Sequence, residues 1–243
     1  MKLDVLAIGA HPDDVELGCS GVLIKEIKRG KKAGIIDLTE GEMSTRGTVE
    51  TRYKEAAEAA KIIGVHVREN LKFRDGFFLN DETNQLKLVQ LLRKYQPEIV
   101  IGNILEDRHP DHGRAGHLIY DACFLSGLGK IQTKNGDGSP QEKWRPKYLL
   151  HYLQDRFYEP DLIIDVSEVW EQRLASIRAY KTQFHNIESQ EPQTYISSPE
   201  FLEAIIARAR LLGKRIGVQF AEGFISKKNI GIKNLEALIL QET

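Results

Sequence analysis

Cysteine is scarce in this 243-residue sequence, and its two cysteines, Cys19 and Cys123, lie far apart and outside any CxxC spacing. This scarcity argues against a disulfide framework and a cysteine-ligated metal site, and favours two small buried side chains in a reduced protein. The sequence also lacks any apolar run near the roughly 20 residues needed to span a bilayer. We therefore expect a cytoplasmic protein with no membrane partner.

An excess of charge is also absent. Lysine and arginine number 34, aspartate and glutamate number 35, and the formal net charge is −1. Nothing in this balance predicts a nucleic acid or an anionic membrane as a partner. The N-terminus lacks the pattern of a secretory signal, because Asp4 interrupts the apolar residues 3–10 and a His-Pro-Asp-Asp motif follows at once.

The chain does contain enough apolar residues, 41% of its composition, to bury one sizeable core. Its one long polar stretch, residues 130–143, is expected to be a surface loop, because strand-like sequence resumes directly after it. No internal repeat divides the chain. The sequence therefore predicts a single domain over residues 1–243.

Short apolar runs alternate with amphipathic segments along the first half of the chain. The runs are continuous, which is typical of strands covered on both faces, and the segments between them have helical periodicity. This order predicts an α/β fold, a three-layer, Rossmann-like, mostly parallel sheet with helices on both faces. We expect strands over residues 5–9, 33–38, 70–73, 99–102, 148–153 and 162–166, and helices over 18–30, 51–63, 85–95, 113–124, 168–184 and 199–216.

Two similar polar clusters follow two of these strands. Residues 9–14 read Gly-Ala-His-Pro-Asp-Asp, and residues 107–112 read Asp-Arg-His-Pro-Asp-His. In a doubly wound sheet, ligands bind beyond the carboxyl ends of the strands, where loops from neighbouring strands converge. One such cluster alone is typical of a turn with a helix-capping aspartate. Two clusters, each after an apolar strand, favour one shared site.

The clusters contain the donors of a catalytic metal site. His11, Asp14 and His112 would supply two imidazoles and one carboxylate, and three protein ligands leave a position open for water, as in catalytic zinc sites. Zinc lowers the pKa of bound water from ~15.7 to about 7, so hydroxide becomes available at neutral pH. The same donors also suit Fe²⁺, which stays open as the metal in the cell.

The remaining residues of the clusters supply acid–base groups. Asp13, next to the ligand Asp14, is predicted to be the general base that takes a proton from water. His109 is placed to stabilise an oxyanion and to help protonate a leaving amine. Asp111 could hold the imidazole of His109 in orientation. Together these groups predict hydrolysis of an amide.

Three further residues are candidates for substrate binding. Arg52 could grip a carboxylate or a hydroxyl group, or it could form an exposed ion pair with Glu55, three residues later. Asp75 follows a predicted strand and could accept hydrogen bonds from sugar hydroxyls, or it could be a turn residue before Gly76. Tyr195 lies in a polar stretch between two predicted helices and could line the site.

At these positions the sequence resembles the LmbE-like (PIG-L) family of zinc N-acetylglucosaminyl deacetylases. The matching motifs run in the family's order: Ala10-His11-Pro12-Asp13-Asp14 with Glu16, Thr39-Glu40-Gly41-Glu42, Thr51-Arg52 with Glu55, Arg74-Asp75-Gly76, and His109-Pro110-Asp111-His112. The later stretch over residues 195–201, followed by Gly223-Phe224, looks like the branch that acts in bacillithiol biosynthesis. The resemblance thus extends over nearly the full length of the chain.

The resemblance implies the same roles for the residues of the two clusters, with substrate contacts at Arg52 and Asp75. It also implies removal of acetate from N-acetylglucosaminyl malate, with Arg52 near the malate carboxylate or the sugar. Members of this branch tend to form trimers or hexamers, which implies a homo-oligomer. Val15 separates Asp14 from Glu16, where some relatives have the acidic residue immediately next, so Glu16 receives no catalytic role.

Three alternatives stay open. An iron(II) oxygenase also uses two histidines and one carboxylate, although the alternating strand–helix order and the additional acid–base residues suit hydrolysis better. A non-catalytic sugar-binding protein could share the fold. The substrate could also be another N-acetylglucosamine compound, such as a chitin disaccharide, a different thiol-cofactor precursor or, least in favour without an amphipathic membrane helix, a glycolipid.

Overall fold

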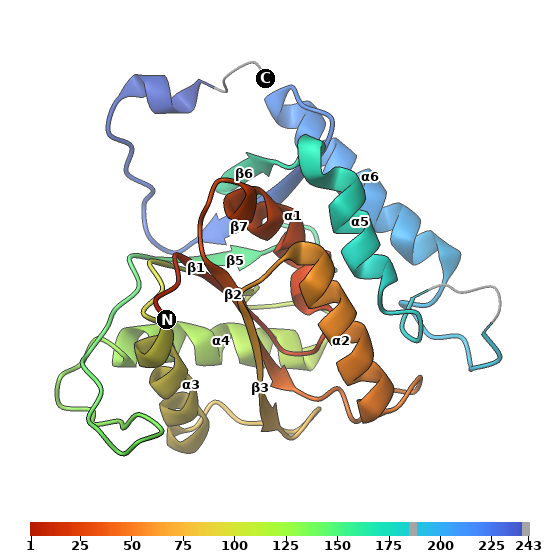
Figure 1. The fold of residues 1–243 in the computed structure, drawn as a ribbon. Coiled ribbons are helices and arrows are strands. Elements are labelled where there is room, and N and C mark those ends of the chain that lie inside the picture. The colour runs from red at the N-terminus through yellow and green to blue at the C-terminus, as the bar shows by residue number, and fades with distance from the viewer. Residues whose placement is uncertain (185–188, 240–243) are drawn as a thin grey trace.

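One mixed sheet organises the chain. The computed structural model describes residues 1–184 and 189–239. Within them, seven strands form a sheet in the order β3-β2-β1-β4-β5-β7-β6 (Figure 1). The strands are β1 (Val5–Gly9), β2 (Ala33–Thr39), β3 (Val67–Phe73), β4 (Ile99–Asn103), β5 (Tyr148–Tyr152), β6 (Leu162–Asp165) and β7 (Ala221–Ser226).

The first five strands are parallel, and β7 runs antiparallel to both of its neighbours, β5 and β6. The chain passes from β1 outward to β3, and then crosses back to place β4 on the other side of β1. Such a reversal is a topological switch point, and ligand sites of open α/β sheets form there, beyond the carboxyl ends of the strands. The predicted mostly parallel sheet is confirmed, with a site expected between β1 and β4.

Helices cover both faces of the sheet (Figure 1). They are α1 (Asp14–Lys28), α2 (Val49–Ile63), α3 (Glu82–Tyr95), α4 (Pro110–Leu125), α5 (Trp170–Arg178) and α6 (Pro199–Ile216), with short 3-10 helices over Ser167–Val169 and Leu235–Leu238. Successive residues of a strand point to opposite faces. Val5 and Ala7 of β1 therefore pack with α1, α5 and α6, and Leu6 and Ile8 pack with α3 and α4. This arrangement confirms the predicted three layers.

Buried polar residues lie at two places where the observed elements differ from the predicted ones, the start of α1 and the strand β7. α1 begins at Asp14, before the predicted start at residue 18, so the acidic motif forms its first turn. The helix is kinked at Cys19 (φ −154°), and the carboxylate of Glu222 accepts two backbone N–H groups just after the kink. Glu222 belongs to β7, a strand that the hydrophobic pattern misses because this buried carboxylate interrupts it.

Helix caps set the other boundaries. α2 and α3 begin before their predicted starts, because Thr48 and Asp81 accept backbone N–H groups of the first turn. α4 begins at Pro110, a residue suited to the first helical position. α5 ends at Arg178, short of the predicted end at residue 184, and the chain continues in turns. No helix in the described part of the chain is long and apolar enough to cross a membrane.

Candidate active site

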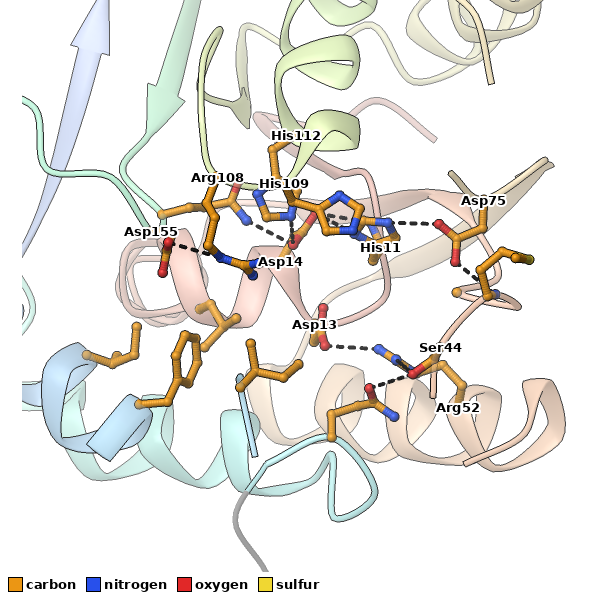
Figure 2. A pocket seen from close by; sticks show the side chains of 18 of the residues that line it. His11, Asp13, Asp14, Ser44, Arg52, Asp75, Arg108, His109, His112 and Asp155 are labelled. Carbon is orange, nitrogen blue, oxygen red and sulfur yellow. Dashed lines mark hydrogen bonds and ion pairs between the residues drawn. The ribbon is translucent and has the colours of Figure 1, made fainter. Parts of the chain in front are cut away.

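The candidate site lies at the switch point between β1 and β4. Residues 10–13 leave β1 and lead into α1, and the second cluster opens α4. Side chains from both clusters converge on one region (Figure 2). Glycine is required at position 9 for this turn, because a Cβ there would lie 2.9 Å from the Cβ of Asp14.

Asp14 lies between the two predicted imidazole ligands. Its Oδ1 is 3.2 Å from Nε2 of His112, and its Oδ2 is 3.7 Å from Nδ1 of His11. The ring centroids of His11 and His112 are 5.6 Å apart. The structure therefore brings the three predicted metal ligands into one cluster.

Neutral amides fix the position of the Asp14 carboxylate. Oδ2 accepts hydrogen bonds from Nδ2 of Asn103 and from the backbone N–H of His11, both at 3.0 Å. Oδ1 accepts a hydrogen bond from Nε2 of Gln154 at 2.8 Å. Burial opposes ionisation, but the charge of His112 and the hydrogen bond with His11 hold the pKa of Asp14 well below its usual value. The cluster thus contains an ionised, oriented oxygen donor.

A second carboxylate orients each imidazole. Nδ1 of His112 is 2.6 Å from Oδ2 of Asp107, and Nε2 of His11 is 3.0 Å from Oδ1 of Asp75. A carboxylate on one ring nitrogen keeps the proton there and leaves a lone pair on the other, which is the usual support of a metal-binding histidine. The nitrogens left with lone pairs are Nε2 of His112 and Nδ1 of His11, the two that lie toward Asp14.

These donors fit a divalent cation. Two groups of described residues have ligand atoms within 4.8 Å of one another: His11 with His109 and His112, and His11 with Asp75 and Asp111. Asp14 belongs to neither group, but its two oxygens lie 3.2 Å from Nε2 of His112 and 3.7 Å from Nδ1 of His11. Burial opposes protonation of His112, but Asp14 and the hydrogen bond to Asp107 raise its pKa to about 9. A cation and this proton compete for the same lone pair. Two imidazoles beside an ionised carboxylate are a common donor set of catalytic zinc.

Asp13 is buried beside Arg52. Its Oδ2 is 2.9 Å from Nη1 of Arg52, which also donates to the carbonyl of Pro12 at 2.6 Å. Burial raises the pKa of Asp13 to about 7, although the charge of Arg52 acts in the opposite direction. The backbone of Asp13 has φ 132°, and such conformations cost ~1–3 kcal/mol in a non-glycine residue and concentrate at functional sites. The structure thus holds a strained, buried carboxyl group against the pocket.

Of the two roles predicted for Arg52, the structure rules out the ion pair with Glu55, and the substrate contact stays a prediction. Arg52 lines the pocket, but its guanidinium contacts Asp13, Pro12 and, at 3.3 Å, the hydroxyl of Ser44. The exposed ion pair with Glu55 does not form, because the Glu55 carboxylate accepts hydrogen bonds from residue 182 instead. Arg52 therefore contacts the candidate general base, Asp13, directly.

His109 caps α4 and lines the pocket. Its Nδ1 accepts the backbone N–H of Asp111 at 3.2 Å, so the proton of the neutral ring resides on Nε2. Burial and the charges of His11 and His112 lower the pKa of His109 to about 4, which leaves the ring neutral at pH 7. His109 therefore offers an N–H donor to a ligand in the pocket.

The carboxylate of Asp111 does not make the predicted contact with His109. Its Oδ2 accepts the N–H of Gly76 at 2.7 Å and lies 3.4 Å from Nε2 of His11. Its Oδ1 lies 2.7 Å from Nη1 of Arg114. The backbone of Asp111 orients His109 instead, because the first turn of a helix has free N–H groups that a capping side chain satisfies.

The two other predicted substrate contacts occupy different places. Asp75 is buried in the pocket, where it accepts the N–H of Met43 at 3.0 Å and supports His11. Tyr195 is 55% exposed and is not part of the pocket lining. Its hydroxyl donates to Asp155, a residue of the lining, at 2.8 Å. Asp75 therefore contacts His11, Tyr195 contacts the pocket residue Asp155, and a substrate contact by either residue stays a prediction.

Three residues that hold the predicted ligands, Asn103, Asp107 and Gln154, lie outside the predicted site roles. Asn103 and Gln154 each come directly after a predicted strand, at the edge of the sheet where the site forms. Asp107 begins the second cluster. Position at the carboxyl end of a strand was therefore the available signal, although it does not say which ligand each residue contacts.

The pocket has a volume of about 210 Å³ and two contrasting sides. Three histidines and three of the aspartates described above contribute polar lining: His11, His109, His112, Asp13, Asp14 and Asp75. Leu17, Ile196, Phe201 and Ile205 contribute an apolar side. Small-molecule sites typically combine apolar walls with a few convergent polar groups. The arrangement therefore suits a small ligand with one polar reacting group.

The sheet, and the imidazole–carboxylate cluster at its switch point, define a class of Rossmann-like α/β proteins with a candidate metal site. The chain belongs to the PIG-L/LmbE-like deacetylase family. The model of the family described as "PIG-L: GlcNAc-PI de-N-acetylase" matches residues 6–123. The crystal structure of the conserved protein TT1542 from Thermus thermophilus shares 36% identity, with a TM-score of 0.85 over 95% of this chain and 97% of that chain.

The curated relatives carry more than one activity. Diacetylchitobiose deacetylase of Thermococcus kodakarensis is 28% identical over 90% of this chain and 81% of that protein. 4-Oxalmesaconate hydratase of Pseudomonas putida is 26% identical over 74% of each. The Bacillus subtilis protein named "Probable N-acetyl-alpha-D-glucosaminyl L-malate deacetylase 2" is 24% identical over 75% of this chain and 84% of that protein. Deacetylases of this family are hydrolases.

Proposed function

We propose that this chain, acting as one domain, hydrolyses the N-acetyl group of an N-acetylglucosaminyl compound with the aid of a divalent cation. The observation that carries the proposal is the ionised carboxylate of Asp14 between the nitrogens of His11 and His112, with Asp13 adjacent in the chain. The matching family model and the diacetylchitobiose deacetylase relative support an acetamide as the reacting group.

Three groups would hold the cation: Nδ1 of His11, a carboxylate oxygen of Asp14 and Nε2 of His112. When bound there, Zn²⁺, or Fe²⁺ in the cell, would supply the Lewis acidity that makes hydroxide available near neutral pH. Asp75 and Asp107 keep the imidazole protons on the opposite ring nitrogens. Asn103 and Gln154 keep the carboxylate from turning away.

Asp13 is the general base of the proposed reaction. Water gives a proton to Asp13 while the water oxygen forms a bond to the acetamide carbonyl carbon. The C–N bond then breaks as Asp13 gives that proton to the amine nitrogen, and acetic acid and the free amine leave, the acid losing its own proton to solvent as acetate. A carboxyl group with a pKa of about 7 suits both transfers at neutral pH. Arg52 fixes the orientation of the carboxylate and keeps part of it ionised.

His109 stabilises the oxyanion in this scheme. Its Nε2–H is a neutral donor fixed by the backbone N–H of Asp111 on the other ring nitrogen. A fixed donor of this kind favours the negative charge that develops on the carbonyl oxygen. Its low pKa, about 4, leaves the protonation of the amine to Asp13.

For the substrate we propose N-acetylglucosaminyl L-malate, in bacillithiol biosynthesis, with a cytoplasmic homo-oligomer as the working form. The Bacillus subtilis relative and the resemblance over residues 195–201 support this substrate. The alternative is a chitin disaccharide, because the relative with the higher identity is named diacetylchitobiose deacetylase. The two substrates differ in the group attached to the acetamido sugar, which is a dicarboxylate in one and a neutral sugar in the other.

Acetate release from N-acetylglucosaminyl L-malate, diacetylchitobiose and free N-acetylglucosamine tests the proposal. The zinc-loaded protein is compared with Asp13→Ala and with a matched control, Asp137→Ala, which changes an exposed loop aspartate. We expect release from the malate compound with the wild type and the control, and its loss in Asp13→Ala. Release from none of the three by metal-loaded wild type would refute the deacetylase proposal.

A second candidate function is hydration of a carbon–carbon double bond, because one relative is a hydratase. Both reactions need an activated water and a group that transfers protons, and the cluster offers both. Hydration of a conjugated dicarboxylate removes its ultraviolet absorbance and releases no acetate. That result, together with inert acetamido sugars, would favour the hydratase over the deacetylase.

A further inference from the structure

Three arginines line the catalytic pocket and differ in what their guanidinium groups contact. Arg52 is bound to Asp13. Arg108 lies 3.1 Å from Asp155 and packs over the ring of Tyr195. Arg208, on α6, has no hydrogen bond, ion pair or aromatic contact with any residue that the structure describes. Of these three arginines, Arg208 is therefore the one whose charge is available to pair with a ligand.

Arg208 is half-buried and remains charged. Burial and the nearby charge of Arg173 lower its pKa to about 10, so the guanidinium stays protonated at neutral pH. A cation that is partly removed from water without a partner is unfavourable. A bound anion would offset that penalty.

Three carboxylates whose charges act on Arg208 are each engaged with other groups. Asp155 accepts the Tyr195 hydroxyl and pairs with Arg108. Asp107 accepts hydrogen bonds from His112 and from the backbone of residue 156. Glu222 pairs with Arg173 at 2.6 Å. These charges act on Arg208 only at a distance.

A second cavity continues the catalytic pocket beside Arg208. We call it the side hollow; it has a volume of about 400 Å³, and its lining includes Asp155, Phe157, Tyr195, Phe201, Ile205 and Arg208. Asp155, Phe201, Ile205 and Arg208 line both cavities. A ligand whose acetamido group reaches the histidines can therefore extend past Arg208 into the side hollow.

We infer that Arg208 is a specificity-determining residue, which binds a carboxylate on the part of the substrate that lies outside the acetamido sugar and occupies the side hollow. This inference rests on the proposed function and deepens it. A guanidinium forms two parallel hydrogen bonds with a carboxylate, a geometry that lysine does not reproduce. A neutral second sugar would leave the charge of Arg208 unpaired. The site therefore selects an acetamido sugar with a carboxylate-bearing aglycone over a neutral disaccharide.

The test compares kcat/KM for N-acetylglucosaminyl L-malate and for diacetylchitobiose in the wild type, Arg208→Gln and Arg208→Lys. Lys214→Gln is the matched control, because it removes an exposed positive charge from the same helix. We expect Arg208→Gln to lower kcat/KM about 30-fold on the malate compound and to change that of the disaccharide less than about threefold. Arg208→Lys should recover part of the loss, and Lys214→Gln should behave as the wild type.

Equal losses on both substrates would overturn the inference, because Arg208 would then support the fold or the chemistry. No loss on either substrate would overturn it too. If the wild type deacetylates neither compound, the proposed function fails, and calorimetric titration with L-malate decides the inference by itself. Binding at least about tenfold weaker in Arg208→Gln would support the inference. Equal binding, or none to the wild type, would overturn it.

Discussion

The cluster at the ends of β1 and β4 and the side hollow beside α6 differ in how fully their polar groups are paired. Asp14 accepts three hydrogen bonds, and a carboxylate supports each of its imidazole neighbours. In the side hollow, Arg208 has no such partner among the described residues, and apolar side chains such as Phe157 and Leu211 form much of the lining.

This difference corresponds to two functions, transition-state stabilisation and substrate recognition. Groups that stabilise a transition state act best when they are fixed before the substrate arrives, because no reorganisation is then needed during the reaction. A group that recognises a substrate contributes most when the free protein leaves it unsatisfied, because binding then replaces an unfavourable state. The mutations below separate the two regions, from the largest expected effect to the smallest.

Asp13→Asn should have the largest effect. Asparagine has the shape of aspartate and can still accept a hydrogen bond from Arg52, but it cannot take a proton from water. We expect kcat to fall ~10²–10⁴-fold, the usual range for loss of a general base. The bound metal and KM should change little, and both are measured beside kcat at pH 7. Activity within tenfold of the wild type would show that another group is the base.

The sequence could predict the cluster of His11, Asp14 and His112, which we call the paired cluster, because its members lie in two short motifs. Each motif follows an apolar strand, and parallel strands end at one edge of the sheet, so His11, Asp14 and His112 could be brought together without coordinates. The same logic failed for side-chain contacts at longer range. It did not show that Arg52 would be bound to Asp13 or that the Asp111 carboxylate would turn to Gly76.

The side hollow could not be predicted in this way. Arg208 lies in an amphipathic helix, where an arginine is ordinarily a solvated residue of the polar face. Its role depends on which side chains surround it, and some of these, such as Asp155 and Phe157, lie more than 40 positions away in the sequence. The pattern likewise missed β7, because the buried Glu222 serves α1 rather than the strand.

Asp107→Asn should weaken the paired cluster without touching a ligand atom. The carboxylate keeps the proton of His112 on Nδ1, and an amide would hold that tautomer less firmly. We expect zinc affinity to fall about 10–100-fold, measured by competition with a chelator, and activity to recover at high zinc. Glu106→Gln, which changes an exposed neighbour, is the control. Unchanged zinc affinity in Asp107→Asn would remove Asp107 from the metal site.

Arg52→Gln should change the pH dependence of the paired cluster. The charge of Arg52 lowers the pKa of Asp13, so its removal raises that pKa above about 7 and keeps the base protonated to higher pH. The acid limb of the kcat/KM profile should therefore move toward higher pH, by about one unit. Arg52→Lys should move it less. A shift toward lower pH, or none, would show that the acid limb reports another group.

Phe201→Ala should have the smallest effect and the least selective one. Phe201 lines both the pocket and the side hollow, and an apolar ring does not distinguish a charged ligand group from a neutral one. We expect KM to rise about fivefold on the malate compound and on diacetylchitobiose alike, with kcat nearly unchanged. Phe124→Ala, an exposed ring on α4, is the control. If Phe201→Ala instead altered the preference between the two substrates as much as Arg208→Gln does, the shape of the wall would set specificity. Arg208 would then not be the residue that recognises the substrate, and the paired cluster and the side hollow would no longer have separate functions.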